Sequence, residues 1–366
     1  MTDYLYTELH DPSATGLNTV PQGINNLGQV VGYYSGTPNG TDGFLYSGGN
    51  YTTIDDPLGV ATSAQGINGS GQIVGAYRDA SNVAHGFLYS GGNYTTLDDP
   101  SAAGTTAAFS INSSGQIVGY YNDVSGVAHG FLDTGGSYTT LDDPLGINGT
   151  FAEDINDNGQ IVGVYYDASN ARHGFLYSSG NYTTLDYPTT QAGNGTNARA
   201  INNTGQIVGR SNDDRPDGNG WLYSGGTYTT LNDPAAAANG SGTQANGIND
   251  SGEIVGYFYG NGYTHGFLAT PVEGPDTGPE PPALTAPASL NVPAGGSTPM
   301  GITASPVDSD DALSVTISGV PLFEAIKAPS GDTVTYQLVK GTRGAGDSRT
   351  FTITAGTAGQ AISGLT

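Results

Sequence analysis

Tyrosines recur at one place in a phrase that this chain repeats, and asparagine or aspartate lies close to several of them. An aromatic ring beside amide and carboxylate oxygens can hold a sugar, because the ring stacks on apolar sugar faces while the oxygens accept hydrogen bonds from hydroxyls. The sequence therefore predicts a glycan-binding surface, with packing between neighbouring sheets as the alternative for at least half of the rings. The candidate binding residues are Tyr33, Tyr34, Tyr77, Tyr120, Tyr121, Tyr165, Tyr166, Tyr257, Asp123 and Asp167.

Aspartates also stand one or two residues in front of a proline at the end of each repeat. Adjacent carboxylates could supply oxygen ligands to calcium. An aspartate before proline can instead end a strand and bond to the backbone of its own turn. No copy has the alternating aspartate loop of a dedicated calcium site, so we favour the turn. The pairs are Asp55 and Asp56, Asp98 and Asp99, and Asp142 and Asp143, with relaxed versions at Asp11, Asp186 and Asp233.

Four histidines occupy equivalent places in the repeats: His85, His129, His173 and His265. A ring of metal ligands is one interpretation, but two of the six copies lack the histidine. We expect each of these histidines to be buried and to bond to a neighbouring turn.

An enzyme needs an asymmetric set of groups, whereas the copies repeat nearly the same residues. The most divergent segment is 210–221, which contains Arg215 and three nearby aspartates but no Ser-His-Asp or metal-ligand spacing. We therefore expect a non-catalytic protein, with a polysaccharide-acting lyase or hydrolase as the alternative.

The composition limits the partners. The 366 residues include 9 Lys and Arg against 33 Asp and Glu, a formal charge of −24, so nucleic acid and anionic membranes would be repelled. Cysteine is absent, which excludes disulfides and thiolate metal sites. No stretch approaches 18 consecutive apolar residues, and residues 1–11 lack the basic and apolar regions of a secretion signal. We expect no membrane insertion and, if the chain is exported, no cleaved N-terminal signal.

A phrase of about 44 residues positions these side chains. Its Ile-Asn anchor begins at Ile24, Ile67, Ile111, Ile155, Ile201 and Ile248. Such a period means that one unit of supersecondary structure is used repeatedly. The sixth copy lacks its closing segment, and residues 6–12 match that segment. A ring needs such completion from its own N-terminus and a linear array does not, so a solenoid is the weaker alternative.

Each copy divides into four extended pieces. In the third copy we expect strands at 107–112, 116–122, 128–133 and 138–142, because these runs are rich in Ile, Val, Tyr, Phe and Thr and are bounded by turn residues. Six such units predict an all-β, six-bladed β-propeller over residues 1–272, closed by the N-terminal strand at residues 4–10.

The phrase INxxGQIVG followed by HGFLY resembles the extracellular HAF-type repeat, with His-Gly-Phe in place of His-Ala-Phe. The matching positions begin at His85, His129, His173 and His265, whereas Asp42-Gly43-Phe44 and Asn219-Gly220-Trp221 depart from the pattern. The resemblance covers about residues 3–270. It implies a secreted or surface-associated bacterial protein and assigns no catalytic residues.

The phrase ends before a Pro/Gly/acidic linker at 273–283. Residues 284–366 resemble a cadherin-like or immunoglobulin-like β-sandwich of bacterial adhesins, and the domain could be incomplete. Its aspartates Asp308, Asp310 and Asp311 form a dense cluster, and the resemblance implies calcium as a possible ligand there.

Together these features predict a secreted or cell-surface binding or adhesion module whose favoured partner is a glycan or surface polymer. No cofactor is required, although calcium could bind. A structural building block of an extracellular assembly, with further adhesin domains or self-association, is a third interpretation.

Overall fold

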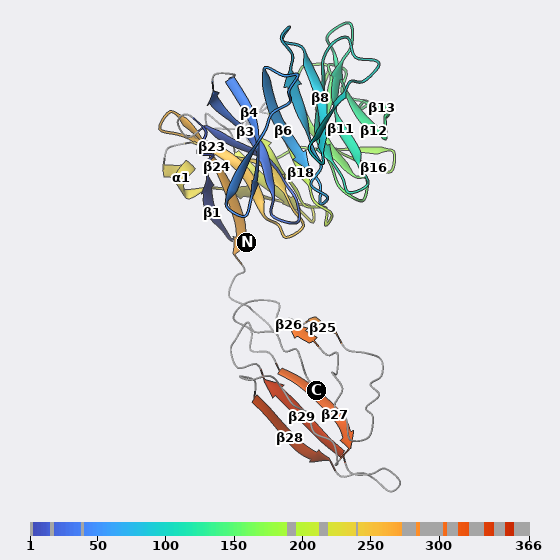
Figure 1. The fold of residues 1–366 in the computed structure, drawn as a ribbon. Coiled ribbons are helices and arrows are strands. Elements are labelled where there is room, and N and C mark those ends of the chain that lie inside the picture. The colour runs from blue at the N-terminus through green and yellow to red at the C-terminus, as the bar shows by residue number, and fades with distance from the viewer. Residues whose placement is uncertain are drawn as a thin grey trace. The chain divides into compact units, whose positions relative to one another are not determined.

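The structure is a computed structural model (Figure 1), and it divides the chain into two compact units, residues 1–274 and 275–366. It describes residues 3–14, 18–37, 40–188, 195–211, 219–238, 241–272, 283–285, 303–305, 314–321, 333–339 and 348–354.

Six four-stranded antiparallel sheets make up the first unit, as the repeat predicts. The first blade contains β2 (Thr19–Ile24), β3 (Val30–Thr37), β4 (Gly40–Ser47) and β5 (Asn50–Ile54), and the second contains β6 (Ala61–Ile67), β7 (Ile73–Arg78), β8 (Ala84–Ser90) and β9 (Asn93–Leu97). The third contains β10 (Thr106–Ile111), β11 (Gln116–Asn122), β12 (Ala128–Thr134) and β13 (Ser137–Leu141). The predicted strands of this copy agree with these bounds to within one residue.

The fourth blade contains β14 (Thr150–Ile155), β15 (Ile161–Tyr166), β16 (Arg172–Ser178) and β17 (Asn181–Leu185). The fifth contains β18 (Thr196–Ile201), β19 (Ile207–Ser211), β20 (Asn219–Ser224) and β21 (Thr227–Leu231), followed by the short helix α1 (Pro234–Ala238). The innermost strands contact one another from blade to blade, and β22 of the last blade contacts β2 of the first. The predicted six-bladed all-β propeller is therefore confirmed.

The sixth blade is built from both ends of this unit. β22 (Thr243–Ile248), β23 (Ile254–Gly260) and β24 (Tyr263–Val272) follow one another, and β1 (Asp3–Leu9) is the outer strand. β1 runs antiparallel to β24, with Asp3 opposite Val272 and Leu9 opposite Gly266.

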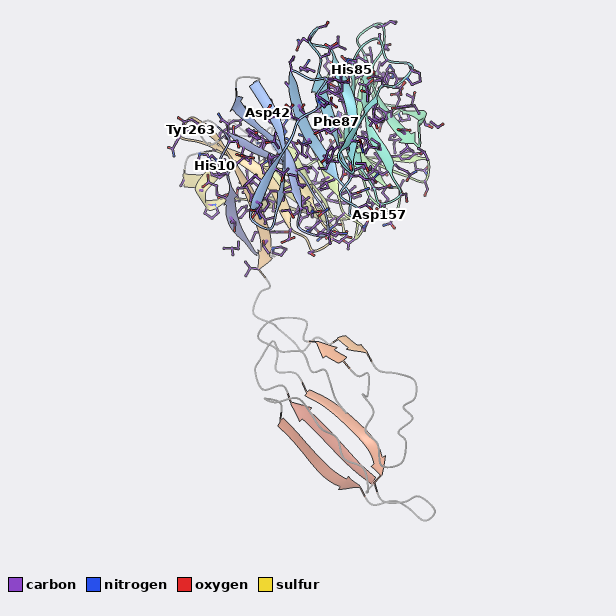
Figure 2. All side chains as sticks on the ribbon, viewed as in Figure 1. His10, Asp42, His85, Phe87, Asp157 and Tyr263 are labelled. Atoms are coloured by element: carbon purple, nitrogen blue, oxygen red, sulfur yellow. The ribbon has the colours of Figure 1, made fainter. Side chains whose placement is uncertain are left out.

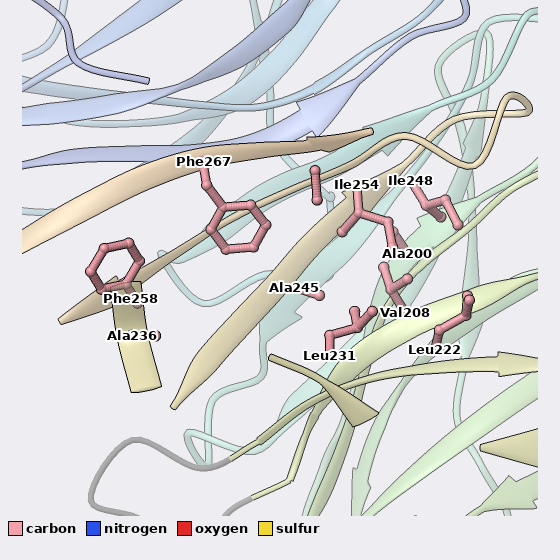
Figure 3. Close-up of a cluster of buried hydrophobic side chains, with 11 residues drawn as sticks. Ala200, Val208, Leu222, Leu231, Ala236, Ala245, Ile248, Ile254, Phe258 and Phe267 are labelled. Atoms are coloured by element: carbon pink, nitrogen blue, oxygen red, sulfur yellow. The ribbon is translucent and has the colours of Figure 1, made fainter. Parts of the chain in front are cut away.

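Aromatic side chains from the third strand of each blade fill the space between blades. The Phe of the His-Gly-Phe phrase is at most 1% exposed, and Trp221 takes its place in the fifth blade without any exposure. Figure 3 shows the corresponding cluster between the fifth and sixth blades, where Phe267 and Ile254 lie near Val208 and Leu231. Burial of each such ring contributes about 2–3 kcal/mol to stability.

Glycine in the second strand allows the tight spacing inside a blade. A Cβ on Gly119 would lie 2.0 Å from the carbonyl oxygen of Ala107 in the neighbouring strand. Gly115, in the turn before that strand, has a φ of 78°, which a residue with a side chain rarely adopts. The backbone conformation therefore requires glycine at both of these positions of the repeated phrase.

The asparagine of the Ile-Asn phrase joins each blade to the next. Asn112 Nδ2 donates to Gln116 Oε1 at 2.9 Å and to the carbonyl oxygen of Asn156 in the next blade at 3.3 Å, and its Oδ1 accepts the backbone N–H groups of Ser114 and Gln116. The same bond between blades recurs six times at 3.0–3.3 Å, including one from Asn249 to Asn25. These bonds form a complete circle, the asparagine ring.

The second unit has two described antiparallel sheets. One pairs β25 (Ala283–Thr285) with β26 (Thr303–Ser305), and the other has the order β27 (Ser314–Pro321), β29 (Ser348–Thr354), β28 (Thr333–Val339). Packing of two sheets into the predicted sandwich, and the predicted calcium ligands Asp308, Asp310 and Asp311, lie outside the described residues. Among the residues that are described, no helix is long and apolar enough to cross a membrane.

Candidate functional site

Each innermost strand contains a β-bulge at the same place. The register of β10 against β11 skips one residue between Ala108 and Ser110, and the other five blades show the same skip. A bulge re-aims the side chain of the skipped residue. The skipped residues line a cavity of about 60 Å³ on the propeller axis, and they are Gln22, Gln65, Phe109, Glu153, Arg199 and Asn246.

These bulge residues break the regularity of the repeat. One guanidinium, Arg199, pairs with the Glu153 carboxylate at 2.8 Å, whereas the second and third blades contribute an amide and a phenyl ring. The expectation that the blades present the same residues is therefore wrong on the axis. The sequence contained a signal for this, because the bulge position varies while its neighbours are nearly constant. In five of the six copies it is followed by a small residue and then Ile-Asn, whereas the bulge position itself is Gln, Gln, Phe, Glu, Arg and Asn in blade order.

The exception is Asp154, which follows the bulge in the fourth blade where the other copies have Gly, Ser or Ala. Its carboxylate accepts hydrogen bonds from the Ser110 hydroxyl and from the backbone N–H groups of Ile201, at 2.7 Å, and Ile155, at 2.9 Å. Burial raises the pKa of Asp154 to about 6, although the three hydrogen bonds oppose the rise. The group thus connects the third, fourth and fifth blades.

Next to the bulges, one side-chain position of each second strand varies from blade to blade. Each lies opposite the Gly of the His-Gly-Phe phrase or its variant, as Tyr120 lies opposite Gly130. In blade order these side chains are Tyr33, Ala76, Tyr120, Val164, Arg210 and Tyr257. The second blade therefore has a methyl group between two tyrosines.

A pocket of about 440 Å³ lies beside Ala76, whose small side chain leaves this space open. We call it the mouth pocket. Aromatic side chains of the first and third blades border it together with polar groups of the second blade. Its main lining residues are Tyr33, Tyr120, Phe109, Gln65, Ser63 and Arg78.

The aromatic wall of the mouth pocket extends into the next blade. The Tyr120 ring lies 5.4 Å from Phe109 and 4.8 Å from Phe151, centroid to centroid. Burial raises the pKa of Tyr33 and of Tyr120, and the Arg78 cation opposes the rise at Tyr120. Both phenols are therefore neutral at physiological pH and can donate hydrogen bonds.

The predicted binding tyrosines divide into two groups. Tyr34, Tyr77, Tyr121 and Tyr165 are 3–6% exposed, and their hydroxyls lie 3.0–3.3 Å from threonines of the fourth strands. These four pack the blades, although Tyr77 also borders the mouth pocket.

The partly exposed tyrosines are Tyr33, Tyr120, Tyr166 and Tyr257. Tyr33 and Tyr120 line the mouth pocket. Tyr257 lies elsewhere around the mouth, where its hydroxyl is 3.4 Å from Arg210 Nη1, and the Tyr166 ring lies 6.0 Å from Phe151. The structure therefore brings together two of the ten candidates as exposed walls of one pocket.

Asp123 and Asp167 hold their own loops. The Asp123 carboxylate accepts the backbone N–H groups of Val127, at 2.9 Å, and Ser125, at 2.8 Å, which lowers its pKa. At Asp167 the Ser169 hydroxyl and two backbone N–H groups have the same effect. Neither aspartate lines the mouth pocket.

Three of the four repeat histidines bridge two carboxylates. His129 Nδ1 lies 2.9 Å from Asp142, its Nε2 lies 3.7 Å from Asp123, and its ring stacks on Tyr121 at 5.2 Å. His85 and His173 repeat this arrangement. The expectation of buried histidines bonded to a turn is correct for His265 alone, which is 8% exposed with Nε2 at 3.0 Å from the Gly260 carbonyl oxygen.

The two nitrogens of each bridging histidine face different carboxylates, so they do not converge on one point. Among the described residues, no group of three His, Asp or Glu side chains could hold a metal ion. The aspartates before proline support the turn interpretation, because Asp56, Asp99 and Asp143 are buried and each accepts the backbone N–H two residues later.

The opposite mouth of the channel is a network of mutually satisfied polar groups. Figure 2 shows Asp157 and His85 at opposite ends of the sheets. Asn203 Nδ2 donates to Asp157 at 3.0 Å and to Asp250 at 2.9 Å, and Asn26 Nδ2 donates to Asp250 at 2.6 Å. These carboxylates thus bond within the ring.

In the divergent segment 210–221 the structure describes both ends and not residues 212–218. Arg210 Nη1 donates to Gln244 Oε1 at 2.9 Å, so Arg210 belongs to the channel mouth, and Trp221 belongs to the core.

A family model described as a protein of unknown function, DUF3466, matches residues 134–258, and no curated protein matches the chain. The chain is similar to a fungal six-bladed β-propeller lectin from Aleuria aurantia that recognises fucose, with 16% identity, a TM-score of 0.46, and coverage of 74% of this chain and 93% of that one.

It is also similar to AofleA from Arthrobotrys oligospora, with 11% identity, a TM-score of 0.47, and coverage of 74% and 91%. The β-propeller domain of the Trilobed protease from Pyrococcus furiosus gives 8% identity, a TM-score of 0.45, and coverage of 69% and 92%.

Proposed function

We propose that the chain is a non-catalytic glycan-binding module and that the mouth pocket is its binding site. The observation that carries this proposal is the pocket of about 440 Å³ between Tyr33 and Tyr120, with Phe109 on the channel side. Its volume falls in the range of small-ligand pockets, and its aromatic walls combine with a few polar groups, the usual composition of such a site.

The polar groups suit a saccharide. Gln65 supplies an amide with two donors and an acceptor, Ser63 supplies a hydroxyl, and Arg78 supplies a guanidinium at the rim. Tyrosine rings cover the apolar faces of a sugar while their hydroxyls bond to its oxygens. This set binds through several directional contacts and contributes no nucleophile with an activating base.

The two carboxylates that line the cavity on the propeller axis are engaged in structure, which favours binding over hydrolysis. Glu153 pairs with Arg199, and Asp154 accepts three hydrogen bonds. Glycoside hydrolysis needs two carboxyl groups facing each other across a substrate. Turnover of a polysaccharide by the purified chain would contradict the non-catalytic part of the proposal.

The same proposal places the module at the cell surface or outside the cell, in an adhesive role, as the likeness of its phrase to extracellular repeats suggests. We also propose that β1 closes the ring in solution, which the pairing of Leu9 with Gly266 and the contact between the Tyr6 and Phe267 rings support. A closed ring would keep the mouth pocket rigid.

A glycan array tests the proposal, using the full chain in calcium and again in a chelator. We expect binding that Tyr120→Ala weakens by about tenfold or more, because a buried aromatic contact contributes roughly 1–2 kcal/mol or more to binding. Tyr263→Ala is the matched control, since Tyr263 is 44% exposed, begins β24 and does not line the mouth pocket. Absence of binding to every glycan, or equal losses in both variants, would refute the pocket as a glycan site. Loss of binding in the chelator would assign calcium a part.

A further inference from the structure

The cations of the propeller gather at one end of it. The described residues of the first unit include four arginines and no lysine: Arg78, Arg172, Arg199 and Arg210. Arg78 and Arg210 lie at the ends of second strands, Arg172 begins a third strand, and Arg199 is a bulge residue on the axis. All four therefore lie on the side of the mouth pocket, in a chain that carries 33 acidic residues.

Three of these cations, Arg78, Arg172 and Arg210, form no salt bridge with a carboxylate among the described residues. Arg199 has Glu153, whereas Arg78 Nη1 donates to the carbonyl oxygen of Asn82 at 3.1 Å and Arg210 bonds to the Gln244 amide oxygen and the Tyr257 hydroxyl. Arg210 Nε is buried without a hydrogen bond. Burial lowers the pKa of Arg210, and the charge of Arg199 adds to this effect.

Of the described guanidiniums without a carboxylate partner, only that of Arg78 lines the mouth pocket. Arg78 lines it next to Tyr120, and the cations of Arg199 and Arg210 act on the Tyr33 phenol, where they oppose the rise of its pKa. A guanidinium bonded to neutral acceptors can form two parallel charged hydrogen bonds to a carboxylate, and Arg78, the last residue of β7, is exposed and therefore accessible to such a ligand.

We infer that the mouth pocket takes an acidic saccharide, a uronic acid residue whose carboxylate pairs with Arg78 while a neighbouring residue of the same polymer extends toward Arg210. This inference rests on the proposed function and narrows its ligand class.

The net charge of the chain does not prevent this binding. At physiological ionic strength charges are screened beyond about 8 Å, so the distant acidic surface acts weakly on a bound carboxylate. The contacts with Arg78 and Arg210 act at hydrogen-bond distance and are screened much less.

The experiment uses an array of paired oligosaccharides, in which each oligouronate is accompanied by its methyl ester and its neutral parent sugar. We expect binding to at least one oligouronate and a loss of about tenfold or more on esterification, since a hydrogen bond to a charged group contributes roughly 1.5–3 kcal/mol.

The same loss should follow Arg78→Gln, with Arg78→Lys losing less because it keeps the charge. Arg210→Gln should weaken longer oligouronates more than single residues. Arg172→Gln is the control, since Arg172 does not line the pocket.

The outcomes separate the two proposals. Equal binding of oligouronates and their neutral parents, with no effect of Arg78→Gln, would overturn the acidic ligand while leaving glycan binding intact. Failure to bind any saccharide would overturn both proposals.

Discussion

Asp154 stands where the other five copies have a small residue, and it makes stability depend on pH. Its pKa is raised to about 6 by burial, against 3.8 for an ordinary aspartate. Between pH 4 and pH 6 the folded chain therefore holds a proton that the unfolded chain has lost. The contribution of this group to the free energy of unfolding falls as pH rises through that window and is constant above it.

Asp154→Asn should remove this dependence. We expect the unfolding free energy of wild type minus that of the variant to fall by about 3 kcal/mol from pH 4 to pH 7, the equivalent of two pKa units. Urea unfolding at both pH values measures it. Asp167→Asn should give the opposite sign in unfolding measured below pH 4, because hydrogen bonds lower the pKa of Asp167 and its contribution to stability is lost as pH falls through that lowered pKa. A difference that does not change with pH at Asp154 would contradict the assignment.

Adjacent tyrosines illustrate what the sequence could and could not predict about the site. Alternation along a strand implies that Tyr120 and Tyr121 face opposite sides, but both sides of a blade are covered, so alternation alone does not identify the side that opens on a pocket. The distinction comes from Ala76 in the preceding blade and from the bulge that exposes Phe109. Both residues, Ala76 and Phe109, differ from their counterparts in other copies of the repeat. Comparing the residues at each repeat position across the six copies would have indicated them.

At the scale of elements, the asparagine ring fastens one sheet to the next. Asn112 is 3% exposed, and it satisfies groups of its own turn as well as a carbonyl of the following blade. The strand pattern, the turns and the blade number were predictable, because local propensity and periodicity determine them. The role of Asn112 was not, because it depends on a carbonyl 44 residues away.

Asn112→Ala should lower the free energy of unfolding by about 2 kcal/mol or more, since it leaves buried backbone and amide groups without partners. Asn93→Ala is a matched control, because the Asn93 side chain is exposed and donates to the Gly91 carbonyl of its own turn, not to another blade. We expect the control to lie within about 0.5 kcal/mol of wild type in urea unfolding. Equal effects of the two substitutions would mean that the asparagine ring does not stabilise the propeller.

At the scale of the whole molecule, ring closure buries one face of β1 against the core and leaves the other face exposed. Leu9 is 4% exposed and belongs to the core cluster with Phe44 and Val255, whereas Leu5 in the same strand is 63% exposed. A docked β1 also removes the open edge of β24, which could otherwise pair with another chain.

Leu9→Ala and Leu5→Ala therefore test closure within a single strand. We expect Leu9→Ala to lower the free energy of unfolding by about 2–5 kcal/mol and Leu5→Ala to change it little, because only the first substitution leaves a cavity in the core. Thermal unfolding of the full chain measures both. Indistinguishable melting temperatures would show that β1 does not dock on β24 in solution.

The measurement that tests the binding site most directly is the affinity of Ala76→Tyr for the saccharide that wild type binds most tightly. Ala76 lies opposite Gly86 as Tyr33 lies opposite Gly43, so the second blade can accept the tyrosine that its neighbours carry. That ring would fill the mouth pocket. We expect an unchanged fold by circular dichroism and a dissociation constant raised by tenfold or more, which equals about 1.4 kcal/mol. Wild-type affinity in this variant would contradict the account.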